Sequence, residues 1–105
     1  ALHFENPDPG RYPCLGLALA ALGQGGAAPA VLNGGNEAVV EAFLDEELHF
    51  NHIASYLQRL MLLLDRWRQK PECPNYLQHI NSVDDALAAN RWGRSQLRHL
   101  LETTS

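Results

Sequence analysis

The stretch from residue 28 to residue 46 constrains the fold most, because it combines helical periodicity with a broad apolar face. Its sequence is APAVLNGGNEAVVEAFLDE. Apolar or small residues recur at spacings of three and four, the period of a helix that buries one side: Val31, Gly35, Val39, Ala42 and Phe43, widened by Leu32 and Val40. Such a helix is not stable alone in water. The stretch therefore predicts a fold in which neighbouring helices cover it.

Two further segments carry the boundary signals of helices on either side of this one. The segment 13–23 begins at Pro13, which suits the first helical position, and it ends in a cluster of glycines at 23, 25 and 26. The segment 51–69 begins at Asn51, a good N-cap residue, and its apolar stripe is Ile53, Leu57, Leu60, Met61, Leu64 and Trp67. Both segments are predicted to be helices.

A last helix is predicted over residues 82–102. Ser82 with Asp85 three residues later resembles a capping box in which Asp replaces the usual Glu. Its apolar stripe consists of Val83, Ala86, Leu87, Gly93, Leu97, Leu100 and Leu101. Asn90 falls on the same stripe, where it either caps a new helical segment after a break or makes a hydrogen bond inside the bundle.

These segments predict an all-α fold, an antiparallel bundle of about four helices, in a single domain spanning residues 1–105. Alternation of apolar and polar residues is absent, so nothing in the sequence indicates strands. Residues 1–12 are predicted to form an extended arm. Residues 68–81 are predicted to form a long connection with a short helical turn at 76–79. Gly34 and Gly35 lie inside the second helix, which favours close contact between helices; a kink or a ligand near the backbone is the alternative.

Charge and composition disfavour several function classes. The formal net charge is −4 and no basic face is present, which argues against nucleic-acid binding. No apolar run approaches the length of about 18 residues that a membrane span needs, and no secretory signal is recognisable. Cys14 and Cys73 have no metal-binding or redox spacing, which favours a reducing, cytoplasm-like compartment. The missing initiator Met indicates a trimmed chain or a fragment.

A few residues are candidates for chemistry, each with a plain structural alternative. Glu46 and His49 form a Glu-x-x-His pair with His52 three residues further on, a spacing that can hold a metal in helical bundles; solvated residues at a helix corner are the default interpretation. Cys14 lies at a helix N-terminus, which can lower a thiol pKa, but a buried structural role is favoured. Cys73, between two prolines, is expected to be exposed or half-buried and unreactive.

Surface recognition offers two more candidates. Asn33, Asn36 and Glu37 form either a polar docking patch or a plain solvated helix face. Trp67 and Trp92 are expected at the edge of the core or as interface anchors, rather than as ligand platforms. No Ser–His–Asp arrangement can be argued from the sequence, and no residue is assigned as catalytic, cofactor-binding or metal-binding.

Four segments, in order, carry a resemblance to a known family: RYPCLGLALAAL (11–22), PAVLNGGNEAVVEAFL (29–44), LHFNHI (48–53) and SVDDALAANRWGRS (82–95). Together they resemble the C-terminal helical domain of 1-deoxy-D-xylulose 5-phosphate reductoisomerase, which makes 2-C-methyl-D-erythritol 4-phosphate in the non-mevalonate isoprenoid route. The most specific part is Leu-Asn-x-x-Asn-Glu at 32–37. The sequence departs from the family at Gly34 and Gly35, where Ala-Ala is usual, and at Asn90, where Asp is usual.

The resemblance implies a support domain that is inactive by itself. In that family NADPH is held by an N-terminal Rossmann domain, and the divalent metal, Mg²⁺ or Mn²⁺, is held with the substrate by a central domain. Those two domains are the partners that the resemblance implies, in a bacterial cytosol or a plastid-type organelle. No cofactor is expected in this chain. The alternative is a free-standing helical interaction or dimerisation module with no enzymatic role, and self-association is left open.

Overall fold

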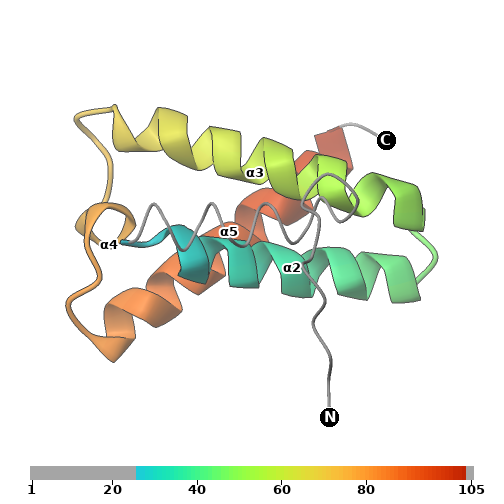
Figure 1. Ribbon diagram of the computed structural model, residues 1–105, viewed down its shortest axis with the longest axis horizontal. Coiled ribbons are helices and arrows are strands. Elements are labelled where there is room, and N and C mark those ends of the chain that lie inside the picture. The colour runs from blue at the N-terminus through green and yellow to red at the C-terminus, as the bar shows by residue number, and fades with distance from the viewer. Residues whose placement is uncertain (1–25, 104–105) are drawn as a thin grey trace, which may run out of the picture.

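The structure, a computed structural model, describes residues 26–103, and the regular secondary structure within that range is helical. Its elements are α2 (Ala28–Leu44), a 3-10 turn η1 (Phe50–His52), α3 (Ile53–Arg68), the short α4 (Asn75–Gln78) and α5 (Val83–Thr103) (Figure 1). No strand occurs among these residues. The all-α prediction is therefore confirmed. The predicted helix at 13–23, the arm at 1–12 and Cys14 lie outside the described residues.

Consecutive long helices run in opposite directions. In Figure 1, α2 runs from left to right, α3 returns above it, and α5 again runs from left to right, crossing α2 at an angle. The most extensive packing joins α2 to α5, with α3 covering both. No helix among residues 26–103 is both long enough and apolar enough to cross a membrane.

Helix α2 ends two residues before the predicted boundary because the chain turns sharply after Leu44. The amide of Glu46 donates to the carbonyl of Phe43 at 3.1 Å, and the amide of Glu47 donates to the carbonyl of Ala42 at 2.9 Å. This pair of bonds is the Schellman motif that closes many helices. Glu46 occupies its left-handed position, with φ at +60°, where glycine is the usual residue.

The core lies between the facing sides of α2, α3 and α5. Its largest fully buried side chains are Val31, Val39, Leu57, Leu60, Leu64, Leu77 and Leu97. The predicted stripe of α3 is confirmed. The stripe of α2 was predicted too broadly, because Val40 is 43% and Phe43 is 40% exposed. These two residues lie on the side of α2 away from the core, which is built around Val31, Ala38 and Ala42.

Two glycines let the backbones of α2 and α5 touch where they cross. A Cβ atom added to Gly34 would lie 1.9 Å from the carbonyl oxygen of Asn90, and one added to Gly93 would lie 2.2 Å from the carbonyl oxygen of Val31. A Cβ atom at Gly35 would instead meet the end of the Leu60 side chain at 2.3 Å. The prediction of close helix contact at Gly34 and Gly35 is confirmed.

The predicted N-cap at Asn51 is wrong. Asn51 lies inside η1, and α3 starts after His52, with no side-chain cap bond at that position. The tight turn follows His49, which has an extended backbone and whose carbonyl accepts the amide of His52 at 2.9 Å. A 3-10 turn at a helix N-terminus satisfies amides that a cap residue would otherwise satisfy.

The connection before α5 is ordered by the predicted short helical turn, which appears as α4. Leu77 is fully buried. The Arg68 Nε atom donates to the carbonyl of Leu77 at 3.0 Å, and the Gln78 Nε2 atom donates to the carbonyl of Arg68 at 2.7 Å. These two bonds hold α4 against the C-terminal end of α3.

Helix α5 begins with the predicted cap. The amide of Asp85 donates to the Ser82 Oγ atom at 3.1 Å, and the amide of Asn81 donates to an Asp85 carboxylate oxygen at 3.0 Å. The helix continues through Asn90 without a break. The assignment of Val83 and Leu87 to the buried stripe is wrong, since they are 76% and 52% exposed; the first turns of α5 extend beyond the helices that cover the rest of it.

Candidate functional site

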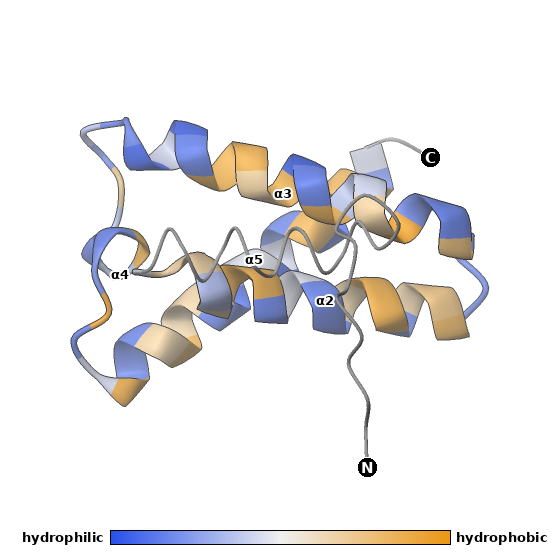
Figure 2. Cartoon of the chain, viewed as in Figure 1, coloured by the Kyte–Doolittle hydropathy of each residue, from blue (hydrophilic) through white to orange (hydrophobic). Residues whose placement is uncertain are grey.

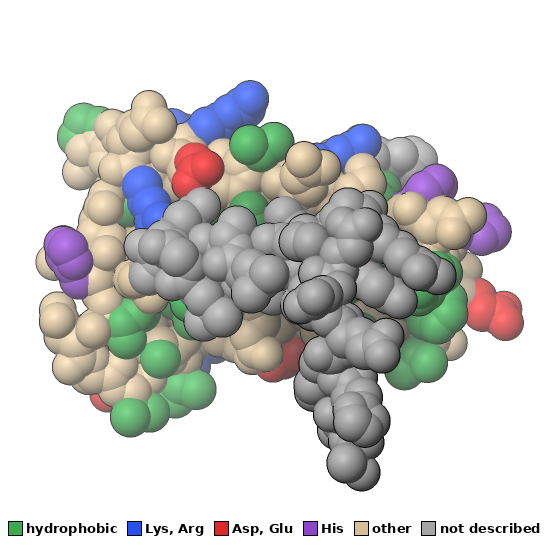
Figure 3. Space-filling view, viewed as in Figure 1, with side chains coloured by type: hydrophobic (Ala, Val, Ile, Leu, Met, Phe, Trp, Pro, Cys, Tyr) green, Lys and Arg blue, Asp and Glu red, His purple; other side chains and the backbone are tan. Residues whose placement is uncertain are grey.

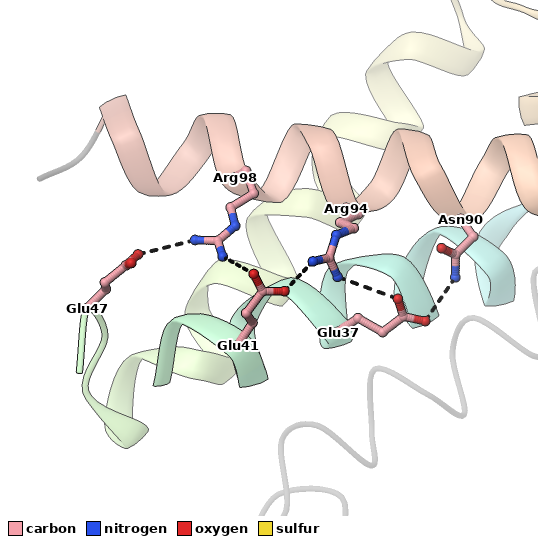
Figure 4. Close-up of polar contacts among 6 residues, drawn as sticks. All are labelled: Glu37, Glu41, Glu47, Asn90, Arg94 and Arg98. Carbon is pink, nitrogen blue, oxygen red and sulfur yellow. Dashed lines mark hydrogen bonds and ion pairs between the residues drawn. The ribbon is translucent and has the colours of Figure 1, made fainter. Parts of the chain in front are cut away.

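A ladder of polar side chains joins α2 to α5 along one flank of the domain (Figure 4). We call it the α2–α5 ladder: Glu37, Glu41 and Glu47 on one side and Asn90, Arg94 and Arg98 on the other. Glu41 binds both arginines, with 2.8 Å between its Oε1 atom and the Arg98 Nη2 atom. Arg98 also reaches Glu47 at 3.2 Å, and Arg94 reaches Glu37 at 3.6 Å.

The helical repeat explains the ladder. Glu37 and Glu41 are four residues apart on α2, and Asn90, Arg94 and Arg98 are four residues apart on α5, so each set projects from one side of its helix. Because the two helices run in the same direction, the rungs follow in register. Hydrogen bonds from Arg94 and then Arg98 lower the pKa of Glu41. Burial opposes the charge of Arg98, but the carboxylates of Glu41 and Glu47 raise its pKa overall.

The candidate polar patch is largely absorbed into this ladder. The Asn33 Nδ2 atom donates to a Glu37 carboxylate oxygen at 3.0 Å, and the Asn90 Nδ2 atom reaches the same oxygen at 3.4 Å. Asn90 thus makes a hydrogen bond within the bundle, one of its two predicted roles. Asn36 is exposed. A docking role for Asn33, Asn36 and Glu37 stays a prediction.

Glu46, His49 and His52 do not converge. Within residues 26–103, no group of three or more His, Cys, Asp or Glu side chains is placed to hold a metal ion. The rings of His49 and His52 are 6.1 Å apart between centroids and meet edge to face. The structure therefore gives the metal hypothesis no support. Glu46 lies in the turn after α2, so it does not share a helical face with His49 and His52.

The remaining candidates lie at the margin of the core. Cys73 is half-buried, as predicted, and its thiol donates weakly to the carbonyl of Pro74 at 3.5 Å. Trp67 and Trp92 are partly buried against the core and meet edge to face at 6.5 Å between ring centroids. Lys70 covers the Trp67 ring at 4.6 Å. The two tryptophans therefore join α3 to α5, as expected of residues at the edge of a core.

Sequence reasoning missed two features. One is the α2–α5 ladder, whose only signal is the matched four-residue spacing of acids in α2 and arginines in α5. The other is a group of exposed apolar side chains at the C-terminal end of α2, which we call the apolar corner: Val40, Phe43, Leu44 and Phe50. The residues of this corner were indistinguishable from core residues by type.

The described part of the molecule is thus a helical packing domain in which ladder side chains bind one another. The family model described as the DXP reductoisomerase C-terminal domain matches residues 1–96. The chain belongs to this family.

Curated relatives match between half and nearly all of the chain. The 1-deoxy-D-xylulose 5-phosphate reductoisomerase of Trichlorobacter lovleyi is 38% identical over 97% of this chain, which is 23% of that protein. That of a Nostoc species is 44% identical over 91% of this chain and 22% of its own length. That of Cupriavidus metallidurans is 62% identical over 50% of this chain and 14% of its own.

A solved structure shares the fold. The 1-deoxy-D-xylulose 5-phosphate reductoisomerase of Zymomonas mobilis, in complex with NADPH, superposes with a TM-score of 0.72 at 34% identity. The match covers 97% of this chain and 24% of that one. The chain therefore spans about a quarter of the length of the relatives it matches.

Proposed function

We propose that this chain is the C-terminal support domain of an NADPH- and divalent-metal-dependent 1-deoxy-D-xylulose 5-phosphate reductoisomerase, an enzyme of isoprenoid precursor synthesis. The observation that carries the proposal is the match of residues 1–96 to the C-terminal domain of that family, in relatives about four times as long. The full length, 1–105, acts as one helical domain. It contributes packing surface and leaves the reacting groups to the rest of the enzyme.

The described residues do not fit the cofactors of that enzyme. Residues 26–103 bring together no three metal ligands, and the carboxylates of Glu37, Glu41 and Glu47 already bind Arg or Asn side chains. Dinucleotide phosphates are commonly held by a glycine-rich turn between a strand and a helix, and residues 26–103 contain no strand. We propose, as the family resemblance implies, that an N-terminal Rossmann domain holds NADPH and that a central domain holds Mg²⁺ or Mn²⁺. The bacterial source of the relatives supports a cytoplasmic location.

A chimeric enzyme tests the proposal. The C-terminal quarter of the Zymomonas mobilis reductoisomerase that matches this chain is replaced by the chain, and NADPH oxidation is measured with 1-deoxy-D-xylulose 5-phosphate and Mg²⁺. The control is the same enzyme truncated before that quarter. We expect the chimeric enzyme to be soluble and active and the truncated enzyme to be inactive.

Two outcomes would contradict the proposal. A truncated enzyme that is as active as the chimeric enzyme shows that the domain gives no support. A chimeric enzyme no more active than the truncated one, together with a well-folded chain in isolation, favours the alternative of a free-standing interaction module.

A further inference from the structure

The apolar corner is a concentrated exposed apolar surface at one end of the domain. Leu44 and Phe50 are each 72% exposed, and Val40 and Phe43 are 43% and 40% exposed. In Figure 3, hydrophobic side chains gather at the right-hand end, over the C-terminal end of α2. In Figure 2, the C-terminal end of α2 is coloured mostly as hydrophobic. Contiguous exposed apolar patches commonly mark interaction sites.

Within residues 26–103, this surface lies outside the core. Val40, Phe43 and Leu44 follow at helical spacing on the side of α2 away from the core, while Ala38, Val39 and Ala42 pack against α3 and α5. The rings of Phe43 and Phe50 meet edge to face at 6.0 Å between centroids, which links the end of α2 to η1. Both rings line a shallow hollow together with Leu48, His49 and the acidic residues 46 and 47. The corner is therefore a shaped surface with a recess.

The rim of the apolar corner is acidic. Three consecutive acids, Asp45, Glu46 and Glu47, occupy the turn between α2 and η1, and all three are exposed. Glu47 is directed back toward Arg98 of the ladder. An apolar centre with an acidic rim is complementary to a surface with an apolar centre and Lys or Arg around it, since interfaces combine a hydrophobic core with a charged margin.

We infer that the apolar corner is the surface through which this domain docks on the preceding part of the same reductoisomerase polypeptide. The inference rests on the proposed function, because the relatives contain about three quarters of their length outside the matched region. That additional chain supplies a partner at high effective concentration, which a separate protein lacks. The facing surface is apolar and bordered by basic side chains.

The chimeric enzyme described above tests this surface with paired substitutions. One variant carries Leu44→Lys and Phe50→Lys. The matched control carries Leu62→Lys and Val83→Lys, which change two residues that are 55% and 76% exposed elsewhere on the domain. We expect the residual activity after heating to be about tenfold lower for the corner variant than for the unmodified chimeric enzyme, because a few buried anchor residues dominate interface energies. The control variant should match the unmodified chimeric enzyme.

Three further measurements separate docking from folding. The unfolding midpoint of the 105-residue chain alone should fall no further for the corner variant than for its control. The backbone amides of residues 44–50 should exchange their hydrogens with solvent more slowly in the chimeric enzyme than in the chain alone. Sedimentation of the chain alone should show a monomer; a dimer that the corner substitutions dissociate would assign the surface to a second copy and overturn the inference.

The two proposals fail in different ways. An inactive unmodified chimeric enzyme counts against the proposed function. An active chimeric enzyme whose corner variant and control variant behave alike retains the proposed function and overturns the docking surface.

Discussion

At the scale of single residues, the main chains of α2 and α5 meet at Gly34 and Gly93. Backbone atoms, unlike side-chain ends, cannot rotate away from an added methyl group. At Gly35 the added atom would meet only the end of the Leu60 side chain, which can move further than a main chain can. Gly34 therefore makes room for the main chain of α5, whereas Gly35 makes room for the side chain of Leu60.

We predict that Gly34→Ala destabilises the chain by about 1–3 kcal/mol, the usual cost of overpacking. Gly35→Ala should change the free energy of unfolding by less than about 1 kcal/mol, because the gain in helix propensity offsets the displacement of Leu60. Urea unfolding followed by circular dichroism measures both. Equal losses for the two variants would show that the backbones of α2 and α5 are not in contact at Gly34.

Glu46 is the other residue with a special backbone. Its φ of +60° is unfavourable for a residue with a Cβ atom. We predict that Glu46→Gly stabilises the chain by about 0.5–1 kcal/mol. Glu46→Ala is the control, since it removes the carboxylate but keeps the Cβ atom. The unfolding temperature of Glu46→Gly should be higher than those of the unmodified chain and of Glu46→Ala. Equal unfolding temperatures for Glu46→Ala and Glu46→Gly would mean that the charge of the side chain, and not the backbone conformation, is responsible.

At the scale of elements, the α2–α5 ladder makes the pairing of two helices dependent on pH. The folded-state pKa of Glu41 lies below its ordinary value. A carboxyl group of this kind contributes stability above its unfolded pKa and loses that contribution as the pH falls through its folded pKa. The contribution is therefore present at neutral pH and lost in acid.

We predict that Glu41→Gln lowers the unfolding temperature at pH 7 and that the difference from the wild-type chain disappears as the pH falls below the ordinary value of 4.5. Added salt should narrow the difference at pH 7, because exposed ion pairs are screened. Glu72→Gln, which removes an exposed carboxylate outside the ladder, is the control. A pH-independent difference for Glu41→Gln would refute a role for its charge.

The elements also show how far the sequence determines the fold. The apolar periodicity was sufficient to predict α3, and the pair Ser82 and Asp85 was sufficient to predict the start of α5, because both signals are local in the sequence. Val40 and Phe43 were misplaced because α2 is apolar on two sides, and only the position of α5 decides which side is buried. Arg94 and Glu41 are 53 residues apart, so the ladder depends on helix register that local patterns do not contain. Asn51 was misassigned because η1 replaced a side-chain cap.

At the scale of the whole molecule, residues 26–103 share one core and present two distinct surfaces, the ladder and the apolar corner. The ladder closes one flank by joining α2 to α5, and the apolar corner leaves the end of α2 available to a partner. The family match is to a C-terminal domain, and the chain spans about a quarter of the length of the relatives it matches. On this account, the ladder residues serve the domain's own structure, and catalysis depends on the chain only through docking and stability.

Steady-state kinetics of the chimeric enzyme carrying His52→Ala and Cys73→Ala tests that account most directly. We predict a kcat for NADPH oxidation within about twofold of the unmodified chimeric enzyme, because neither of these side chains contributes to the transition state. A fall in kcat of about a hundredfold or more, the size of a lost acid–base group, with unchanged folding would contradict it.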